Sequence, residues 1–120
     1  MKIAVSVGKP DLDAPVDPRF GRAPYFLIVE TDTMAWEAVE NKQSLDLPQG
    51  AGIQAARTVL DRNPQVVLTG NCGPKAFMVL QAKGVAVCIG VVGSARGAVQ
   101  GYVQGRYTPA EGPNVEGHWV

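Results

Sequence analysis

The sequence is short of the residues on which several kinds of protein depend. Its 120 residues contain 2 cysteines and 1 histidine, and 11 basic residues balance 11 acidic ones. A net charge of zero argues against a nucleic-acid partner, because phosphate binding needs an excess of lysine and arginine on one face. A single histidine and the lack of a paired acid leave no recognisable catalytic triad. We therefore expect a protein that is not an enzyme.

Long apolar stretches are also missing. No run approaches the ~20 residues that cross a bilayer. The start of the chain, Met1–Val7, lacks the charged region, apolar run and cleavage site of a signal peptide. We expect a cytoplasmic protein with no membrane partner. Cys72 and Cys88 are then expected to be free thiols, and their spacing matches no zinc or thioredoxin motif.

What the chain does contain is the composition of a folded domain. Hydrophobic residues make up 46% and charged residues 18% of the sequence, which is too apolar for disorder. A chain of this length builds one core. Residues 1–120 are therefore predicted to form a single domain, in which the aperiodic tail 106–120 either folds over the site or hangs free.

Hydrophobic periodicity predicts the order β-β-β-α-β-α-β-α. Apolar and alternating runs predict strands over residues 2–7, 25–30, 36–41, 66–69 and 85–89. Helical spacing predicts a helix over residues 51–62, one from Pro74 to before Gly84, and one after a Ser94 cap. The inner stripe of the last helix is predicted to be Ala95, Ala98, Val99, Tyr102 and Val103.

This order of elements predicts the topology of the sheet. The short turn at 31–34 makes a hairpin, and the later strand–helix–strand units are right-handed parallel crossovers. We expect a five-stranded mixed sheet in the order 3-2-1-4-5 with helices on both faces, a three-layer α/β arrangement like the ribonuclease H-type fold. The loop at 8–23 and the turns at 70–73 and 90–94 then share one edge, where open α/β sheets bind ligands.

The turn Gly70-Asn71-Cys72-Gly73-Pro74 joins a predicted strand to a predicted helix. Glycines there permit positive φ and close approach of a ligand to the backbone, and the helix N-terminus offers free N–H groups. The positive end of the helix dipole is expected to lower the pKa of the Cys72 thiol and favour a thiolate that binds a soft metal. The alternative interpretation is a tight turn with a small buried cysteine.

His118 and the segment Asp17–Arg22 carry the other candidate groups. Imidazole is the commonest metal ligand, although a histidine near a chain end is more often simply exposed. Arg19 and Arg22 offer rigid forks of donors that suit an anionic ligand. Equally open is a purely structural loop, pinned by Phe20 and with Asp17 paired to an arginine.

Two kinds of metal site are not predicted. The acids Asp11, Asp13 and Asp17 lack the mid-loop glycine and closing glutamate of a calcium loop, so they are expected to be solvated. Valine and leucine stand where a ribonuclease H-type nuclease presents carboxylates to two metals, which argues against nuclease activity. The glycines at 90–93 are weaker than a dinucleotide-binding fingerprint.

The chain carries four glycine-marked segments in one order: Val16–Ala23, Gly50–Ala56, Thr69–Pro74 and Gly112–His118. Together they resemble the dinitrogenase iron–molybdenum cofactor family, which includes NifX-type carriers and the C-terminal domain of NifB-type proteins. The resemblance covers nearly the whole chain and implies the same ribonuclease H-like fold. It also implies a binding role, since members of the better-studied branches hold an iron–sulfur precursor of the nitrogenase cofactor and hand it on. The chain lacks the radical-SAM cysteine motif, so it is not expected to synthesise the cluster.

The sequence thus predicts a binding or carrier protein for an iron–sulfur or iron–molybdenum-type cluster or its precursor. A preassembled cluster brings its own sulfide ligands. One or two soft side chains are therefore enough to hold it, together with cationic groups and N–H donors that stabilise its negative charge. The predicted site comprises two metal ligands, two cationic groups and two amide donors: Cys72, His118, Arg19, Arg22, Asn71 and Asn114. The expected partners are the cluster and the proteins that donate and accept it, with the chain itself a monomer or weak homodimer.

Two other functions stay open on the sequence alone. The helix N-termini and the arginines also suit a small anion or a phosphorylated metabolite. The exposed hairpin edge at 35–41 suits a protein-interaction domain that needs no cofactor.

Overall fold

The computed structural model of the chain describes residues 1–42 and 50–114. Along this described part, strands and helices alternate as the periodicity predicts, and their ends differ from the predicted ones by at most two residues. The elements are β1 (Lys2–Val7), β2 (Tyr25–Glu30), β3 (Trp36–Glu40), α1 (Ala51–Leu60), β4 (Val66–Leu68), α2 (Pro74–Ala82), β5 (Ala86–Cys88) and α3 (Ala95–Val103).

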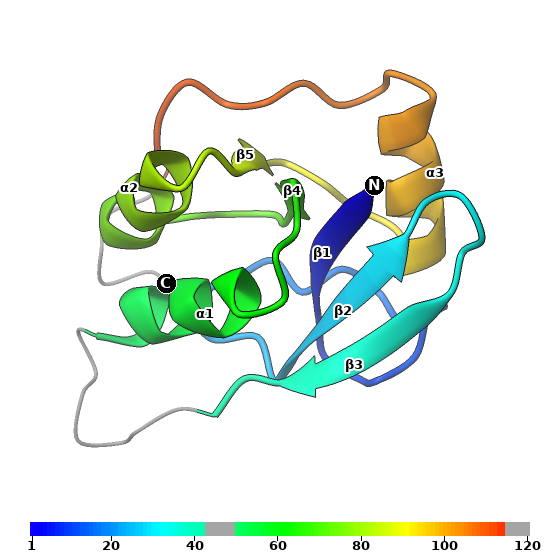
Figure 1. The fold of residues 1–120 in the computed structure, drawn as a ribbon, viewed down its shortest axis with the longest axis horizontal. Coiled ribbons are helices and arrows are strands. Elements are labelled where there is room, and N and C mark those ends of the chain that lie inside the picture. The colour runs from blue at the N-terminus through cyan, green and yellow to red at the C-terminus, as the bar shows by residue number, and fades with distance from the viewer. Residues whose placement is uncertain (43–49, 115–120) are drawn as a thin grey trace.

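The described strands form one five-stranded sheet in the order β3-β2-β1-β4-β5, and the predicted strand order is confirmed (Figure 1). β1 runs antiparallel to β2 and parallel to β4, so that Val5 lies between Leu27 and Leu68. β4 pairs with β5 in parallel, and β2 pairs with β3 as an antiparallel hairpin. The arrangement is compatible with a ribonuclease H-like fold, and that label stays a prediction.

Side-chain alternation along the strands gives the sheet two apolar faces, because successive residues of a strand point to opposite sides. Both faces are covered, so the molecule has three layers. On one face α1 and α2 contribute Ala55, Val59, Phe77 and Leu80 to a core with Ala4, Phe26 and Val67. On the other face α3 contributes Ala95, Ala98 and Val99 to a core with Val5, Leu27 and Leu68.

The predicted inner stripe of α3 is wrong at one position. Val103 is 61% exposed, although it lies one helical turn after the buried Val99. The chain returns over this end of α3, and the ring of Tyr107 lies so close to Gly101 that a Cβ there would approach it to 3.0 Å. Tyr107 therefore covers the last turn of the helix, and Val103 is left facing solvent.

The two edges of the sheet differ. After α3 the chain crosses from α3 to α2 (orange to red in Figure 1), and Ala110 N donates to the carbonyl of Val87 in β5 at 2.7 Å. Residues 106–114 therefore protect the backbone edge of β5, whereas β3 has no described strand beyond it. None of the described helices has the length and apolar character that a bilayer-spanning segment needs.

Candidate functional site at the carboxyl edge of the sheet

The long loop at 8–23 is fastened to the carboxyl edge of the sheet, as the topology predicts. Asp17 N donates to the carbonyl of Ser6 at 2.7 Å, and Val16 N donates to the carbonyl of Gly93 at 2.8 Å. Phe20 is fully buried, and its ring centroid lies 5.1 Å from that of Phe26. The loop is thus an ordered wall of the site, pinned by an aromatic side chain.

A buried pair of hydroxyl groups supports this wall from below. The side chains of Ser6 and Thr69 are both fully buried, and their oxygens lie 2.8 Å apart in a hydrogen bond. Ser6 Oγ also approaches the carbonyl of Asp17 at 2.8 Å. Buried polar groups need partners, so this cluster fixes the loop to β1 and β4. The signal in the sequence is a lone serine inside the apolar strand β1, but hydrophobic periodicity does not indicate its hydroxyl partner.

Two asparagines bring the predicted site segments together. Asn71 Nδ2 donates to the carbonyl of Pro18 at 2.9 Å, and Phe20 N donates to the carbonyl of Asn71 at 3.1 Å. Asn114 Oδ1 accepts from Cys72 N at 2.9 Å, while Asn114 Nδ2 donates to Asn71 Oδ1 at 3.0 Å. The structure therefore assembles the loop, the turn and the end of the described chain at one point.

The Cys72 thiol does not have the low pKa that the helix N-terminus was expected to give it. Its side chain is 0% exposed, and burial raises the pKa to about 12. The cause is desolvation, which penalises the thiolate. The Sγ–H group faces the carbonyl of Gly73 at 3.7 Å. The expectation of a thiolate is thus wrong for this conformation, and the thiol is neutral at neutral pH.

The glycines of the turn also play a different part from the expected one. Gly73, the N-cap of α2, has φ −78°, and the positive-φ glycines of the described chain lie elsewhere, at 84, 90, 93 and 105. At Gly70 a Cβ would stand 2.7 Å from Pro18 Cα. Gly70 therefore permits the loop of the same chain to approach the backbone closely.

The two arginines occupy separate places. Arg19 pairs with Asn71 in a short parallel bridge, its side chain is 52% exposed, and its Nε lies 3.9 Å from Asp17 Oδ1. Arg22 lines a different hollow of about 290 Å³ with Glu40 and Asn41. The structure thus brings Arg19 to the turn that holds Cys72 and places Arg22 beside β3.

Asn41 holds the chain on both sides of Arg22, a role that the sequence did not reveal. It is 5% exposed, and its Nδ2 donates to the carbonyls of Gly21 at 3.3 Å and Ala23 at 2.8 Å. Its backbone N–H donates to the carbonyl of Pro24 at 2.9 Å. These three bonds tie the backbone on both sides of Arg22 to the end of β3.

A pocket of about 400 Å³ opens at the same edge of the sheet. We call it the edge pocket. Its walls are Pro15, Val16 and Pro18 on one side and residues 90–93 on the other, with Gly70 and Asn71 between them. The sequence indicated that these three segments meet, but periodicity contains no information about the space left between them.

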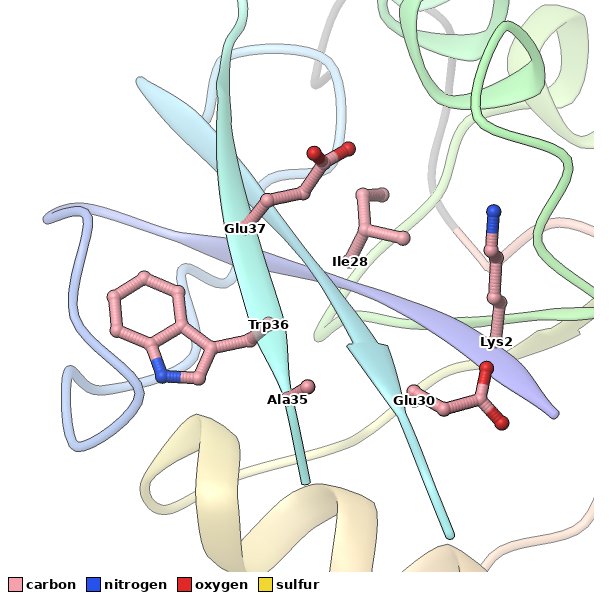
Figure 2. Close-up of a pocket in the computed structure, with 6 residues that line it drawn as sticks. All are labelled: Lys2, Ile28, Glu30, Ala35, Trp36 and Glu37. Atoms are coloured by element: carbon pink, nitrogen blue, oxygen red, sulfur yellow. The ribbon is translucent and has the colours of Figure 1, made fainter. Parts of the chain in front are cut away.

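A third hollow, of about 280 Å³, lies beside β2 and β3, and Lys2 at the start of β1 also lines it. Figure 2 shows the side chains of Ile28 and Glu37 on one side of these strands and the Trp36 indole on the opposite side. Trp36 is 42% exposed, and Glu37 pairs with Arg62 at 3.6 Å. None of the predicted site residues lines this hollow.

His118 is the second predicted metal ligand. It lies outside the described residues, so its predicted position beside Cys72 stays a prediction. Within residues 1–42 and 50–114, no group of three or more His, Cys, Asp or Glu side chains is arranged to hold a metal ion. Cys72 and Cys88 are both free thiols, as expected, and both are buried. Asp13 is 65% exposed, as expected for a solvated acid, and accepts a hydrogen bond from Arg96 Nε at 2.8 Å. Asp17, also expected to be solvated, is only 12% exposed and accepts from Arg19 N at 2.9 Å.

The fold and the site define a class: a three-layer α/β domain with a pocket at the carboxyl edge of its parallel strands. The chain belongs to the dinitrogenase iron–molybdenum cofactor family, whose sequence pattern matches residues 1–105. The resemblance seen in the sequence is thereby confirmed. Among curated proteins, none matches the chain.

Solved structures agree with this assignment. The apo form of the orange protein from Desulfovibrio gigas is 46% identical, with a TM-score of 0.91 over 95% of this chain and 96% of that one. A candidate NifB protein from Thermotoga is 25% identical, with a TM-score of 0.77 over 96% and 97% of the two chains. A candidate dinitrogenase from Methanocaldococcus jannaschii, 16% identical with a TM-score of 0.71 over 94% and 97%, shares the fold.

Proposed function

We propose that the protein is a non-enzymatic carrier in the cytoplasm. Its cargo is an iron–sulfur or iron–molybdenum-type cluster, or a precursor of one, which it receives from a donor protein and passes to an acceptor. Membership of the cofactor family supports this role. So does the similarity to the orange protein, which was solved in its apo form, because an apo form is by definition one that lacks a group the protein binds.

One structural observation carries the proposal: three distant segments with the chemistry for a cluster meet at a single point. Asn71 bonds to Pro18 in the arginine-bearing loop, and Asn114 bonds to both Asn71 and the backbone of Cys72. Arg19 stands beside Asn71 with its guanidinium half-exposed. A half-exposed cationic group beside a pocket suits an anionic cluster that is bound without a full set of protein ligands.

Each predicted site residue has a proposed part. Cys72 and His118 ligate metal, and Arg19 and Arg22 attract the anionic cargo. Asn71 and Asn114, whose side-chain amides are used within the chain, act by holding the turn in place. Cys72 has a pKa of about 12 and no exposed surface, so metal must displace its proton and the turn must open to admit it. Because these two costs weaken metal binding by Cys72, they favour release of the cluster, which a carrier requires.

Anaerobic reconstitution tests this function. The full chain is incubated with ferrous iron, sulfide and a thiol reductant, desalted, and analysed for visible absorption and for iron and sulfide content. Cys88→Ala is the matched control, because Cys88 is an equally buried free thiol in the opposite core. We expect cluster uptake by wild type and by Cys88→Ala, and loss of uptake in the Cys72→Ala/His118→Ala double variant.

The outcomes separate the site from the function. Uptake by the folded double variant equal to that of wild type removes the proposed ligands. No uptake by wild type, even when molybdate is added with sulfide, removes the carrier function. Size-exclusion chromatography with light scattering on the same samples tests the proposal that the carrier is a monomer or a weak homodimer.

A further inference from the structure

The loop 90–93 forms one wall of the edge pocket and is not among the proposed site residues. Gly90 N donates to the carbonyl of Gly70 at 2.8 Å, and Val91 N donates to that of Thr69 at 3.1 Å. These bonds anchor the first half of the loop to the end of β4. The carbonyl of Gly93 accepts from Val16 N at 2.8 Å, which anchors its far end to the opposite wall.

Two backbone donors remain between these anchors. Within the described part of the chain, the N–H groups of Val92 and Gly93 donate to no protein group. Gly90 and Gly93 have φ values of +71° and +90°. Residues with a side chain rarely adopt this backbone conformation, which makes the loop tight. Successive amides in such a turn can form an anion-binding concavity. The loop thus contributes two lining residues of the pocket whose N–H groups have no acceptor in the described part of the chain.

The rest of the lining is apolar and uncharged. Proline, valine and glycine predominate, and no charged side chain is among the lining residues. Val92 itself is 74% exposed at the rim. The volume of about 400 Å³ lies within the range of roughly 300–1,000 Å³ typical of small-molecule sites. A wall of this kind gives little compensation for the loss of a tight hydration shell.

Groups nearby that would suit a phosphate are already engaged. At the N-terminus of α3, the N–H groups of Ala95 and Arg96 donate to the loop carbonyls of Ala14 and Leu12. The third, of Gly97, donates to Ser94 Oγ at 3.0 Å. The Arg96 guanidinium contacts both carboxylate oxygens of Asp13, at 2.8 and 3.4 Å. The helix end therefore offers a phosphate no free donors and no free cation.

From these observations we infer that the edge pocket is the seat of the cargo and selects a compact, weakly hydrated anion with soft acceptor atoms, such as the sulfide face of a cluster. Val92 N–H and Gly93 N–H donate to that face, the apolar walls contact it, and Arg19 adds attraction from the rim. The inference rests on the proposed function and adds the residues and the ligand class. It excludes phosphate-type anions from this seat.

A two-dimensional NMR titration of the ¹⁵N-labelled full chain tests the seat. Sodium thiocyanate is the soft-anion probe, sodium phosphate the strongly hydrated one, and sodium chloride keeps the ionic strength constant. We expect saturable shifts of the Val92 and Gly93 amides with thiocyanate and none there with phosphate. A larger response to phosphate at these amides overturns the selectivity. Thiocyanate shifts confined to the first turn of α2, at Lys75, overturn the location.

A matched pair of variants sharpens the test. Val92→Asp and Val92→Asn place side chains of almost equal size on an exposed position, so both are expected to fold and to differ only in charge. Val92→Asp should weaken thiocyanate binding by about tenfold or more, because a carboxylate at the rim repels an anion. Val92→Asn should stay within about threefold of wild type. Equal affinities for the two variants contradict the seat.

The same pair separates this inference from the carrier function. Cluster uptake that fails in Val92→Asp and persists in Val92→Asn supports both the edge pocket as the seat and the carrier function. Uptake by Val92→Asp equal to that of wild type leaves the carrier function intact and removes the seat. Val92-dependent thiocyanate binding without cluster uptake by wild type leaves the seat intact and removes the carrier function.

Discussion

The side chains of Asn71 and Asn114 hydrogen-bond to each other across 43 positions of the chain, with Asn114 Nδ2 donating to Asn71 Oδ1 at 3.0 Å. Asn71 continues the chain of bonds to the carbonyl of Pro18. The pair thus joins the loop, the turn and the segment after α3 that carry the proposed site residues. Both side chains use their amides for assembly of the site.

This relationship predicts energetic coupling. Asn71→Ala and Asn114→Ala should each lower the free energy of unfolding by about 0.5–1.5 kcal/mol. The double variant should lose less than the sum, by about 0.5 kcal/mol or more, because both single changes break the same bond. Urea denaturation of the four proteins measures the coupling. Gln100→Ala, on the exposed face of α3, is the control, and strict additivity contradicts the coupling.

Gly70 should not tolerate a side chain. A Cβ there would stand 2.7 Å from Pro18 Cα and 3.0 Å from its carbonyl oxygen, so the loop must move. We expect Gly70→Ala to destabilise the protein by about 1–3 kcal/mol, the usual cost of overpacking. Gly8→Ala is the matched control, because nothing lies within 4 Å of a Cβ at that position. Equal midpoints of urea unfolding for the two variants would refute the close approach.

Phe20 should be the residue on which the order of the long loop depends. Its fully buried ring packs against Phe26, and Phe20→Ala should cost about 3–5 kcal/mol, as for other buried phenylalanines. Trp36→Ala removes a larger aromatic group that is 42% exposed and should cost much less. Thermal or urea unfolding ranks the two variants. A larger loss for Trp36→Ala is the contrary result.

The cysteines should respond to high pH in a definite direction. Burial raises the pKa of Cys72 to about 12 and that of Cys88 to about 11, from an ordinary value of 9.0. Above pH 9 the unfolded chain loses these protons while the folded one keeps them. The stability associated with the neutral thiols is therefore complete below pH 9 and falls as the pH rises toward 12. Wild type should lose stability more steeply than Cys72→Ala between pH 9 and 11.

Thiol labelling gives a second measure of the same shift. At pH 8 an aromatic disulfide reagent should react with the native protein far more slowly than with the urea-unfolded chain, because the thiolate is the reactive form. In Cys88→Ala, where Cys72 is the remaining thiol, the rate of labelling should continue to rise with pH well beyond pH 9. A rate that reaches its plateau near pH 8 would mean a low thiol pKa and restore the expectation drawn from the helix N-terminus.

Much of the fold followed from the sequence, because it depends on local patterns. The alternation in Lys2–Val7 and the apolar run Val66–Leu68 specify strands, and Ser94 caps α3 with a 3.0 Å bond from Gly97 N, as predicted. The hairpin and the right-handed crossovers then favour the strand order that is observed. The family also followed, since four glycine-marked segments in order are a property of the sequence itself.

The site followed only in part. The sequence placed Arg19 and Cys72 at one edge of the sheet, and the structure sets them in neighbouring segments. It did not indicate the Ser6–Thr69 hydroxyl pair, the Asn41 bonds around Arg22, or the edge pocket. Each of these depends on contacts between segments far apart in the chain, and periodicity within a segment does not contain them.

The sequence by itself determined the elements, their order in the sheet and the segments that meet at its carboxyl edge, because hydrophobic period and crossover handedness are local or nearly local constraints. Only the tertiary structure decided the state of Cys72 and the partner of Gly70. A helix N-terminus is expected to lower the pKa of a thiol, but complete burial raises the pKa of Cys72. Desolvation depends on every segment packed around a group, and that packing exists only in the folded chain.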